Sequence, residues 1–185
     1  MQKSKCCLLI VFLILVLTLT LGMCFFYFRP KNDIEIIEGK EYLNFLAEKI
    51  NKTNGPIEVI MFNVWFNFSD PSMKNFENIL KSNSNRIKII VDDGNYLGKN
   101  EMRKRISVCK YLNGLGIETR LDSSEYLTHA KVVIFSNNCA LVGPSNWNWY
   151  SFNTNEEINI FFCSDKVKEL EKVFESLWDE GKSCL

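Results

Sequence analysis

The chain has 185 residues, 46% of them hydrophobic, and its 22 basic and 22 acidic side chains leave no formal net charge. All 22 acidic residues but only 20 basic ones follow residue 28, so that part of the chain has a formal charge of −2. This balance excludes a protein that coats nucleic acid with its whole surface, and any polyanion has to bind a local patch. The length predicts one compact domain plus an apolar segment.

The apolar segment, residues 6–28, contains no charged side chain. As a helix, its 23 residues would extend roughly 34 Å, enough to cross a hydrocarbon core of about 30 Å. A cleaved signal peptide is the alternative, but its apolar region usually has only about 7–15 residues. The length favours an uncleaved, single-pass membrane anchor. We therefore expect residues 1–28 to be tail and anchor, residues 29–39 a linker and residues 40–185 the folded domain.

The membrane and the side on which the domain lies stay open. Lys3 and Lys5 before the segment are nearly balanced by Arg29 and Lys31 after it, so the positive-inside rule gives no orientation. Glycosylation-type triplets begin at Asn51 and at residue 67. They would suit a lumenal domain, although such short triplets often arise by chance.

Beyond the linker, helical and extended patterns alternate. Helices are expected over 40–50, from Asp70-Pro71 onward, over 101–115 and over 166–178, and strands over 57–64, 86–91, 117–121, 131–135, 139–142 and 158–162. Asp70 and Pro71 are typical of a helix start, and the polar turn 136–138 predicts a hairpin between its flanking strands. The strand–helix–strand order predicts parallel neighbours. The fold class is therefore α/β, with a mixed, mostly parallel sheet flanked by helices.

Four cysteines follow the apolar segment, at positions 109, 139, 163 and 184. None has the spacing of a metal site, and one histidine cannot complete such a site, so we expect no metal and no cofactor. Cys139 and Cys163 lie in apolar runs, where a free cysteine behaves as a small hydrophobic residue.

Basic residues concentrate in Lys99–Lys110, which includes Arg103, Lys104 and Arg105. This segment is the best candidate for a patch that binds a polyanion. An ordinary solvated helix face is the alternative interpretation.

The segment 129–157 reads HAKVVIFSNNCALVGPSNWNWYSFNTNEE and holds the only histidine of the chain. His129 and Lys131 share one face of a strand, because side chains repeat every two residues. A lone histidine is more often an ordinary surface residue than a catalyst. An imidazole beside an ammonium, however, forms a poor core and a good site for an oxyanion.

The spacing of this segment resembles the signature of the phospholipase D superfamily, H-x-K-x4-D, then G-S-x-N after six residues, and later an acid before an apolar strand. The positions that fit are His129, Lys131, Gly143, Asn146 and Glu157. Two positions depart from the signature, since Ser136 replaces its aspartate and Pro144 the serine after its glycine. Ser145, the next residue, offers a hydroxyl nearby.

The resemblance implies a phospholipase D-like domain and a phosphodiesterase. In that family a histidine attacks phosphorus to form a phosphohistidine, and a second histidine protonates the leaving oxygen. Here His129 would be the nucleophile and Glu157 its orienting acid, while Lys131 and Asn146 would bind the non-bridging oxygens. Ser136, Gly143 and Ser145 would support the site, and the scheme requires no metal.

Because the chain has one histidine, the resemblance also implies a homodimer whose second chain supplies the second histidine. The phosphodiester substrate stays open between nucleic acid and phospholipid, with a slight preference for nucleic acid on family grounds. Trp147, Trp149, Tyr150 and Phe152 would stack on bases or contact acyl chains, unless they are core residues.

Two other functions remain open. The altered signature and the single motif suit a catalytically inactive protein that binds phosphate-bearing ligands or remodels membranes. The third hypothesis is a membrane-tethered interaction domain in which His129 is incidental.

Overall fold

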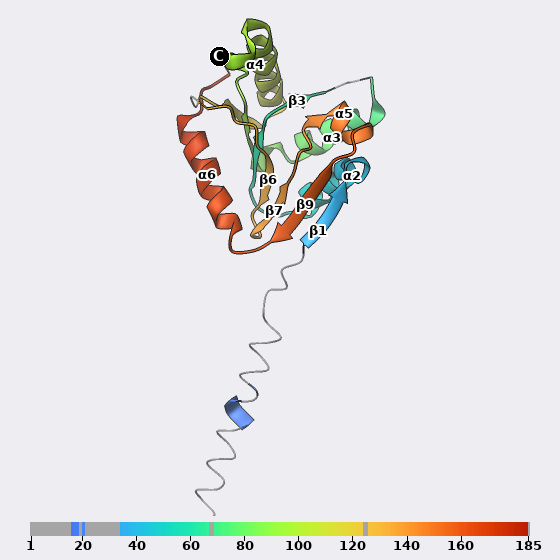
Figure 1. Ribbon diagram of the computed structural model, residues 1–185, viewed down its shortest axis with the longest axis vertical. Helices are drawn as coiled ribbons and strands as arrows, with labels where there is room; N and C mark the ends of the chain where they lie inside the picture. The colour runs from blue at the N-terminus through green and yellow to red at the C-terminus, as the bar shows by residue number, and fades with distance from the viewer. Residues whose placement is uncertain (1–15, 19, 21–33, 67–68, 124–125, 185) are drawn as a thin grey trace, which may run out of the picture. The chain divides into compact units, whose positions relative to one another are not determined.

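The computed structural model describes residues 16–18, 20, 34–66, 69–123 and 126–184 (Figure 1). Contacts divide the chain into two units, Met1–Asn32 and Asp33–Leu185. Most of the predicted anchor lies outside the described residues. Within the described parts of the chain, no helix has the length and apolar character needed to span a membrane.

The second unit is built on a seven-stranded sheet (Figure 1). Its strands, in spatial order, are β1 (Ile34–Glu38), β9 (Ile158–Cys163), β7 (Cys139–Val142), β6 (Lys131–Phe135), β2 (Ile57–Met61), β4 (Ile87–Val91) and β5 (Glu118–Leu121). A separate parallel pair consists of β3 (Val64–Trp65) and β8 (Trp147–Asn148).

The predicted mixed sheet is confirmed, but the expectation that it is mostly parallel is wrong. The parallel pairs of this sheet are β2–β4 and β4–β5. The pairs β1–β9, β9–β7, β7–β6 and β6–β2 are antiparallel. The reason is the hairpin of β6 and β7, since a tight polar turn reverses the chain and only a longer crossover returns it parallel.

Helices cover the two faces of the sheet unevenly. One face carries α2 (Gly39–Lys52), α3 (Pro71–Ser82), α4 (Lys99–Gly114) and the short α5 (Trp149–Asn153), and the other carries α6 (Val167–Glu180). Two 3₁₀ turns, η1 (Ser84–Arg86) and η2 (Asn95–Leu97), flank β4. Helix α3 begins as predicted, because the Asp70 carboxylate accepts hydrogen bonds from the N–H groups of Ser72 and Met73.

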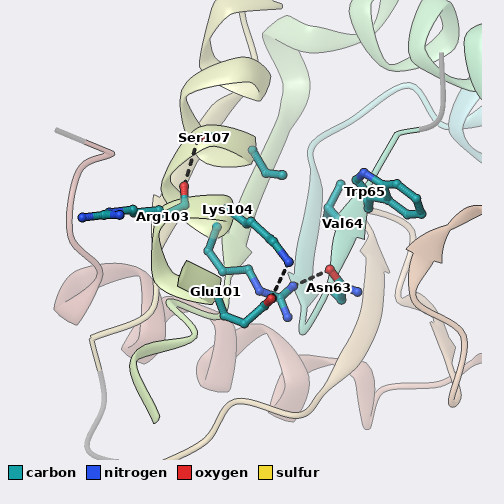
Figure 2. Close-up of a pocket in the computed structure, with 9 residues that line it drawn as sticks. Asn63, Val64, Trp65, Glu101, Arg103, Lys104 and Ser107 are labelled. Carbon is teal, nitrogen blue, oxygen red and sulfur yellow. Dashed lines mark hydrogen bonds and ion pairs between the residues drawn. The ribbon is translucent and has the colours of Figure 1, made fainter. Parts of the chain in front are cut away.

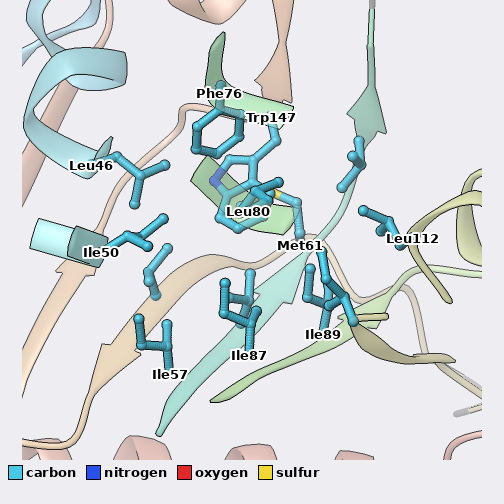
Figure 3. Close-up of a cluster of buried hydrophobic side chains, with 14 of the residues drawn as sticks. Leu46, Ile50, Ile57, Met61, Phe76, Leu80, Ile87, Ile89, Leu112 and Trp147 are labelled. Carbon is cyan, nitrogen blue, oxygen red and sulfur yellow. The ribbon is translucent and has the colours of Figure 1, made fainter. Parts of the chain in front are cut away.

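A hydrophobic cluster lies on each face because alternate side chains of a strand point to opposite sides. The larger cluster joins α2, α3 and α4 to the sheet and includes Leu46, Ile50, Ile57, Met61, Phe76, Leu80 and Leu112 (Figure 3). The smaller cluster packs Ile60, Ile90 and Val132 against Phe174 and Trp178 of α6. Complete burial of each such side chain stabilises the fold by about 1.5–3 kcal/mol. Burial on both sides therefore fixes the positions of the strand ends.

Strand β1 occupies part of the segment expected to be a linker, residues 29–39. It pairs with β9 from Ile34, opposite Phe162, to Glu38, opposite Ile158. The buried side chain of Ile37 belongs to the larger cluster. The folded unit therefore begins before residue 40.

Two disulfides correct the expectation of free cysteines. Cys139 of β7 and Cys163 of β9 are directly opposite in the strand register and are bonded to each other. Cys109 of α4 is bonded to Cys184, which fastens the end of the chain to that helix. The sequence offered no spacing that identifies these partners, because the pairing depends on the strand order.

Candidate active site

The residues singled out in 129–157 meet at one end of the sheet. His129 lies just before β6, Lys131 is the first residue of that strand, and Glu157 lies just before β9. Because β7 runs antiparallel to both β6 and β9, the starts of those two strands and the end of β7 share one edge. Asn146, which follows β7, joins them there.

His129 and Lys131 are in direct contact. The Lys131 Nζ lies 3.1 Å from each ring nitrogen of His129 and donates a hydrogen bond of 2.8 Å to the His129 carbonyl. The ring of Phe62 packs against the imidazole at a centroid distance of 4.4 Å and lies 4.9 Å from the same ammonium. The predicted pairing of imidazole and ammonium is therefore present, and an aromatic ring supports it.

The surroundings of Lys131 favour its neutral form in part. Burial lowers the pKa of Lys131, and the Glu157 carboxylate acts in the opposite direction. A buried ammonium that retains its charge gains most from an anion placed beside it. Lys131 is thus suited to hold a phosphate oxygen.

A hydrogen-bonded chain links Asn146 to Glu157. The Asn146 N–H donates to the Ser151 hydroxyl at 3.1 Å, and that hydroxyl donates to Oε1 of Glu157 at 3.5 Å. Asn155 also donates to Oε1, at 2.9 Å. Sequence analysis missed Ser151, although it lies three residues after Asn148, whose side chain caps α5 by accepting from the Ser151 N–H.

Asn146 and Glu157, the two ends of this hydrogen-bonded network, each have a buried side-chain oxygen without a hydrogen-bond partner. These atoms are Oδ1 of Asn146 and Oε2 of Glu157. Leaving a buried acceptor unpaired costs about 1–3 kcal/mol. Among the described residues, Glu157 makes no hydrogen bond to His129. These oxygens mark places where a donor would bind favourably.

Gly143 and Ser145 shape the turn that precedes Asn146. A Cβ on Gly143 would lie 2.2 Å from Oδ1 of Asn159, so only glycine fits there. The Asn159 amide donates to the Ser145 hydroxyl at 2.8 Å, and its carbonyl oxygen accepts from the Ser145 N–H at 3.3 Å. Asn159, which sequence analysis missed, is a buried polar residue in an otherwise apolar strand. The Ser145 hydroxyl is therefore engaged in holding the turn.

Ser136 is not brought together with these residues. It follows the last residue of β6, where its N–H donates to the Pro56 carbonyl at 3.2 Å and its side chain lies beside Gly55. It lies five positions after Lys131, which corresponds to roughly 16 Å along a strand. The position that departs from the family signature thus lies at the far end of the strand.

The predicted basic segment divides into buried and exposed parts. Arg105 is buried, and its Nη1 donates to the Phe62 carbonyl at 2.7 Å and to Oδ1 of Asn63. Burial lowers the pKa of Arg105, and the nearby Asp92 carboxylate partly offsets this shift. Burial also raises the pKa of Asp92 itself. Arg105 therefore supports the backbone behind Phe62 rather than presenting its charge to solvent.

A groove of about 650 Å³ lies between α4 and β3 (Figure 2). Arg103 and Lys104 line it from the helix, and Trp65 lines it from the strand. Lys104 forms an ion pair with Glu101. The Trp65 ring is half exposed and stacks with that of Tyr150 at a centroid distance of 6.4 Å. The groove therefore combines the basic side chain of Lys104 with an exposed aromatic surface, whereas the Arg103 side chain points away from Trp65 (Figure 2).

The other aromatic residues near the motif mostly pack inward. Trp147 and Phe152 are buried in the larger cluster, and Trp149 packs against it. The Trp149 indole N–H donates to Asp70 at 2.8 Å. Their interpretation as core residues is confirmed, which leaves Tyr150 as the accessible aromatic residue of this group.

Comparisons with known proteins identify the family of this domain. Residues 46–178 match the family described as "Cardiolipin synthase, PLD-like domain". A curated relative, the mitochondrial cardiolipin hydrolase of Xenopus laevis, is 32% identical over 117 residues, covering 62% of this chain and 52% of the relative. The chain thus spans about half the length of that protein.

Two solved structures share the fold. Nuc from Salmonella typhimurium, described as a phospholipase D family member, has a TM-score of 0.66 at 18% identity and covers 82% of this chain and 97% of its own. NucT from Helicobacter pylori has a TM-score of 0.64 at 13% identity and covers 83% and 99%. At these identities the likeness concerns the fold alone.

Proposed function

The chain belongs to the phospholipase D superfamily through its PLD-like domain, and from this membership we propose that it is a membrane-anchored phosphodiesterase with His129 as nucleophile. The observation that carries the proposal is the contact between the His129 ring and the Lys131 ammonium, 3.1 Å apart. The two lie at the sheet edge that also holds the unpartnered oxygens of Asn146 and Glu157.

In the proposed reaction, a neutral nitrogen of His129 attacks phosphorus. A nitrogen–phosphorus bond forms, and the bond from phosphorus to the leaving oxygen breaks. Lys131 and the side-chain amide of Asn146 hold the non-bridging oxygens, where negative charge concentrates in the transition state. Water then attacks the phosphohistidine and restores the free imidazole.

Glu157 is proposed to orient the imidazole during attack. Its Oε2 is buried and unpartnered, so a hydrogen bond from an imidazole N–H would remove an energetic penalty. This role requires the His129 ring to turn from Lys131 toward Glu157. A carboxylate in that position would also stabilise the positively charged imidazolium.

We propose that two chains share the active site. The leaving oxygen needs a proton donor, and the chain has a single histidine. In a symmetric dimer the same surface meets itself, so a second His129 would act as the general acid.

For the substrate we favour nucleic acid over phospholipid. The supporting observation is the groove with Arg103, Lys104 and the stacked pair of Trp65 and Tyr150, since basic side chains and aromatic surfaces together bind single strands. The groove adjoins the site through Arg105, which bonds to the Phe62 carbonyl behind His129. The name of the cardiolipin hydrolase relative supports the phospholipid alternative.

The test uses the full chain in detergent, supplied with bis(p-nitrophenyl) phosphate, single-stranded DNA or cardiolipin in the presence of EDTA. We expect turnover that does not depend on metal. Light scattering on the same preparation should show that the protein is a dimer. Trp65→Leu should reduce cleavage of DNA without changing turnover of the small substrate. Equal loss on both substrates would contradict a role of the groove in binding nucleic acid.

A catalytically inactive, phosphate-binding protein is the second candidate. The observation that favours it is the absence of a hydrogen bond between His129 and Glu157 among the described residues, together with the engagement of the Ser145 hydroxyl by Asn159. Phosphate binding without turnover of any of the three substrates would select this alternative.

A further inference from the structure

An uncovered apolar surface lies on the α6 side of β1 and β9. Directly opposite residues of neighbouring strands share a face, and Ile36 lies opposite Ile160. Ile34 and Ile158 belong to the same face by the two-residue period. These four side chains, called the isoleucine face, are 65% (Ile34), 68% (Ile36), 64% (Ile158) and 44% (Ile160) exposed, which identifies a contiguous patch rather than scattered residues.

The reason for the exposure is the position of α6. This helix packs over β2, β4 and β6, where Phe174 and Trp178 cover Ile60 and Ile90. Among the described helices, α6 alone lies on that side of the sheet. Phe162 of β9 packs against the α6 cluster, whereas β1 and the first half of β9 stay uncovered. A contiguous exposed apolar patch on a folded domain marks a site that binds a protein or a membrane.

The charges around the isoleucine face favour an apolar partner. Glu35, between Ile34 and Ile36, points to the opposite side and pairs with Lys49 of α2 at 3.2 Å. The charged residue of these two strands on the isoleucine face itself is Glu38, at its end opposite Ile158. A protein partner would meet few polar groups there with which to form specific hydrogen bonds.

The connection to the rest of the chain indicates which apolar partner this is. The isoleucine face begins at the first residue of β1, Ile34. The uncharged segment 6–28 ends six residues earlier, and six extended residues span at most about 22 Å. A segment embedded in a bilayer would therefore hold the isoleucine face within reach of the lipid surface.

We propose that the isoleucine face rests on the lipid bilayer and orients the catalytic unit on it. The inference rests on the proposed anchoring through residues 6–28. Helix α4 contributes Cys109 and Leu112 to the cluster on the other side of the sheet, so the groove beside α4 stays open to solvent. Ile158 directly follows Glu157, which places the active-site edge next to the lipid surface.

The experiment uses the full chain with a protease recognition sequence inserted within residues 29–33 and reconstituted into phosphatidylcholine vesicles. After cleavage of the tether, flotation separates vesicle-bound from released catalytic unit. The test variant carries Ile34→Thr, Ile36→Thr, Ile158→Thr and Ile160→Thr, because threonine keeps the branching that strands favour. The matched control carries Leu97→Thr and Val173→Thr, which are 49% and 51% exposed elsewhere.

We expect the wild-type unit and the control to stay on the vesicles, and the bound fraction of the test variant to fall about tenfold or more. Equal release of wild type and test variant overturns the proposal. So does a released wild-type unit that dimerises through this face, because its partner is then a second copy. If circular dichroism shows that the fourfold variant is misfolded, Ile34→Thr with Ile36→Thr decides by the same criterion. Failure of the uncleaved chain to float would instead contradict the proposed anchor.

Discussion

The two ends of strand β6 differ in the hydrogen bonding of the polar groups around them. At its start, the buried Lys131 contacts His129, and unpartnered oxygens of Asn146 and Glu157 belong to the same edge of the sheet. At its far end, the Ser136 N–H is bonded to the Pro56 carbonyl. The disulfide of Cys139 closes the same end. The buried unpartnered oxygens therefore lie at the end where a ligand is expected, whereas none of the described residues at the far end has a buried side-chain oxygen or nitrogen without a partner.

This difference bears on the departure of the chain from its family signature. Ser136 replaces an aspartate, but it lies roughly 16 Å along the strand from Lys131. A charge at that distance near a solvated surface is strongly screened. The departure therefore supports the inactive alternative less strongly than the sequence alone suggests.

The largest effect should follow from removing the nucleophile. We expect His129→Ala to reduce turnover of bis(p-nitrophenyl) phosphate by on the order of 10⁴-fold or more, since it removes the proposed nucleophile. Thermal unfolding should change little because the His129 side chain is exposed. If the variant kept turnover within tenfold of the wild-type value, the start of β6 would not be the catalytic end of the strand.

Changing the unpartnered oxygens should have an intermediate effect. Glu157→Gln keeps the size of the side chain but removes the charge proposed to stabilise the imidazolium, and we expect kcat to fall by about 10²–10³-fold. Its exposed neighbour offers the control, Glu156→Gln, which should retain wild-type turnover. Similar kinetics for both variants would show that the buried carboxylate of Glu157 does not contribute to catalysis.

The pH dependence should reveal the buried cation. Loss of water around the ammonium favours the neutral amine, so the pKa of Lys131 is lowered and its charge is lost at a pH below the ordinary lysine value of about 10.4. We expect kcat/KM to fall as pH rises through that lowered pKa. In Lys131→Arg, whose guanidinium stays charged, any remaining activity should persist to higher pH. An unchanged alkaline limb would exclude Lys131 as its origin.

The smallest effect should come from the far end of β6. Ser136→Asp restores the family residue, yet we expect turnover to change by less than about threefold because that end contacts the Pro56 carbonyl rather than the site. Steady-state kinetics measured beside His129→Ala provide the scale. A gain of a hundredfold would show that the two ends are coupled through the strand.

Much of this arrangement was predictable from sequence. The strands 131–135 and 139–142 were predicted with their observed bounds, because a polar turn separates two apolar runs. Asp70 capped its helix as expected. The sheet was misjudged as mostly parallel, since local patterns do not reveal which strands become neighbours. Ile34–Glu38 lies in the segment expected to be a linker, although its alternation is typical of a strand.

The candidate site was predictable where its residues follow the family spacing, and not where residues act through tertiary packing. His129, Lys131, Asn146 and Glu157 follow a recognisable spacing, and the structure brings them to one edge. Ser151 and Asn159 act through hydrogen bonds that depend on tertiary packing, so no spacing along the chain announces them. The position of Ser136 follows from the predicted strand 131–135, because Lys131 begins that strand and Ser136 directly follows it.

Rapid quenching can show whether His129 forms a covalent bond to phosphorus, the step on which the proposed reaction depends. The full chain is mixed with bis(p-nitrophenyl) phosphate, stopped in base within the first turnover, digested and analysed by mass spectrometry. If His129 is the nucleophile, the peptide that contains it carries the p-nitrophenyl phosphoryl group while one nitrophenolate is released, and His129→Ala shows neither. Turnover in the wild-type protein with every peptide unmodified would contradict it, because water would then attack the substrate without a histidine intermediate.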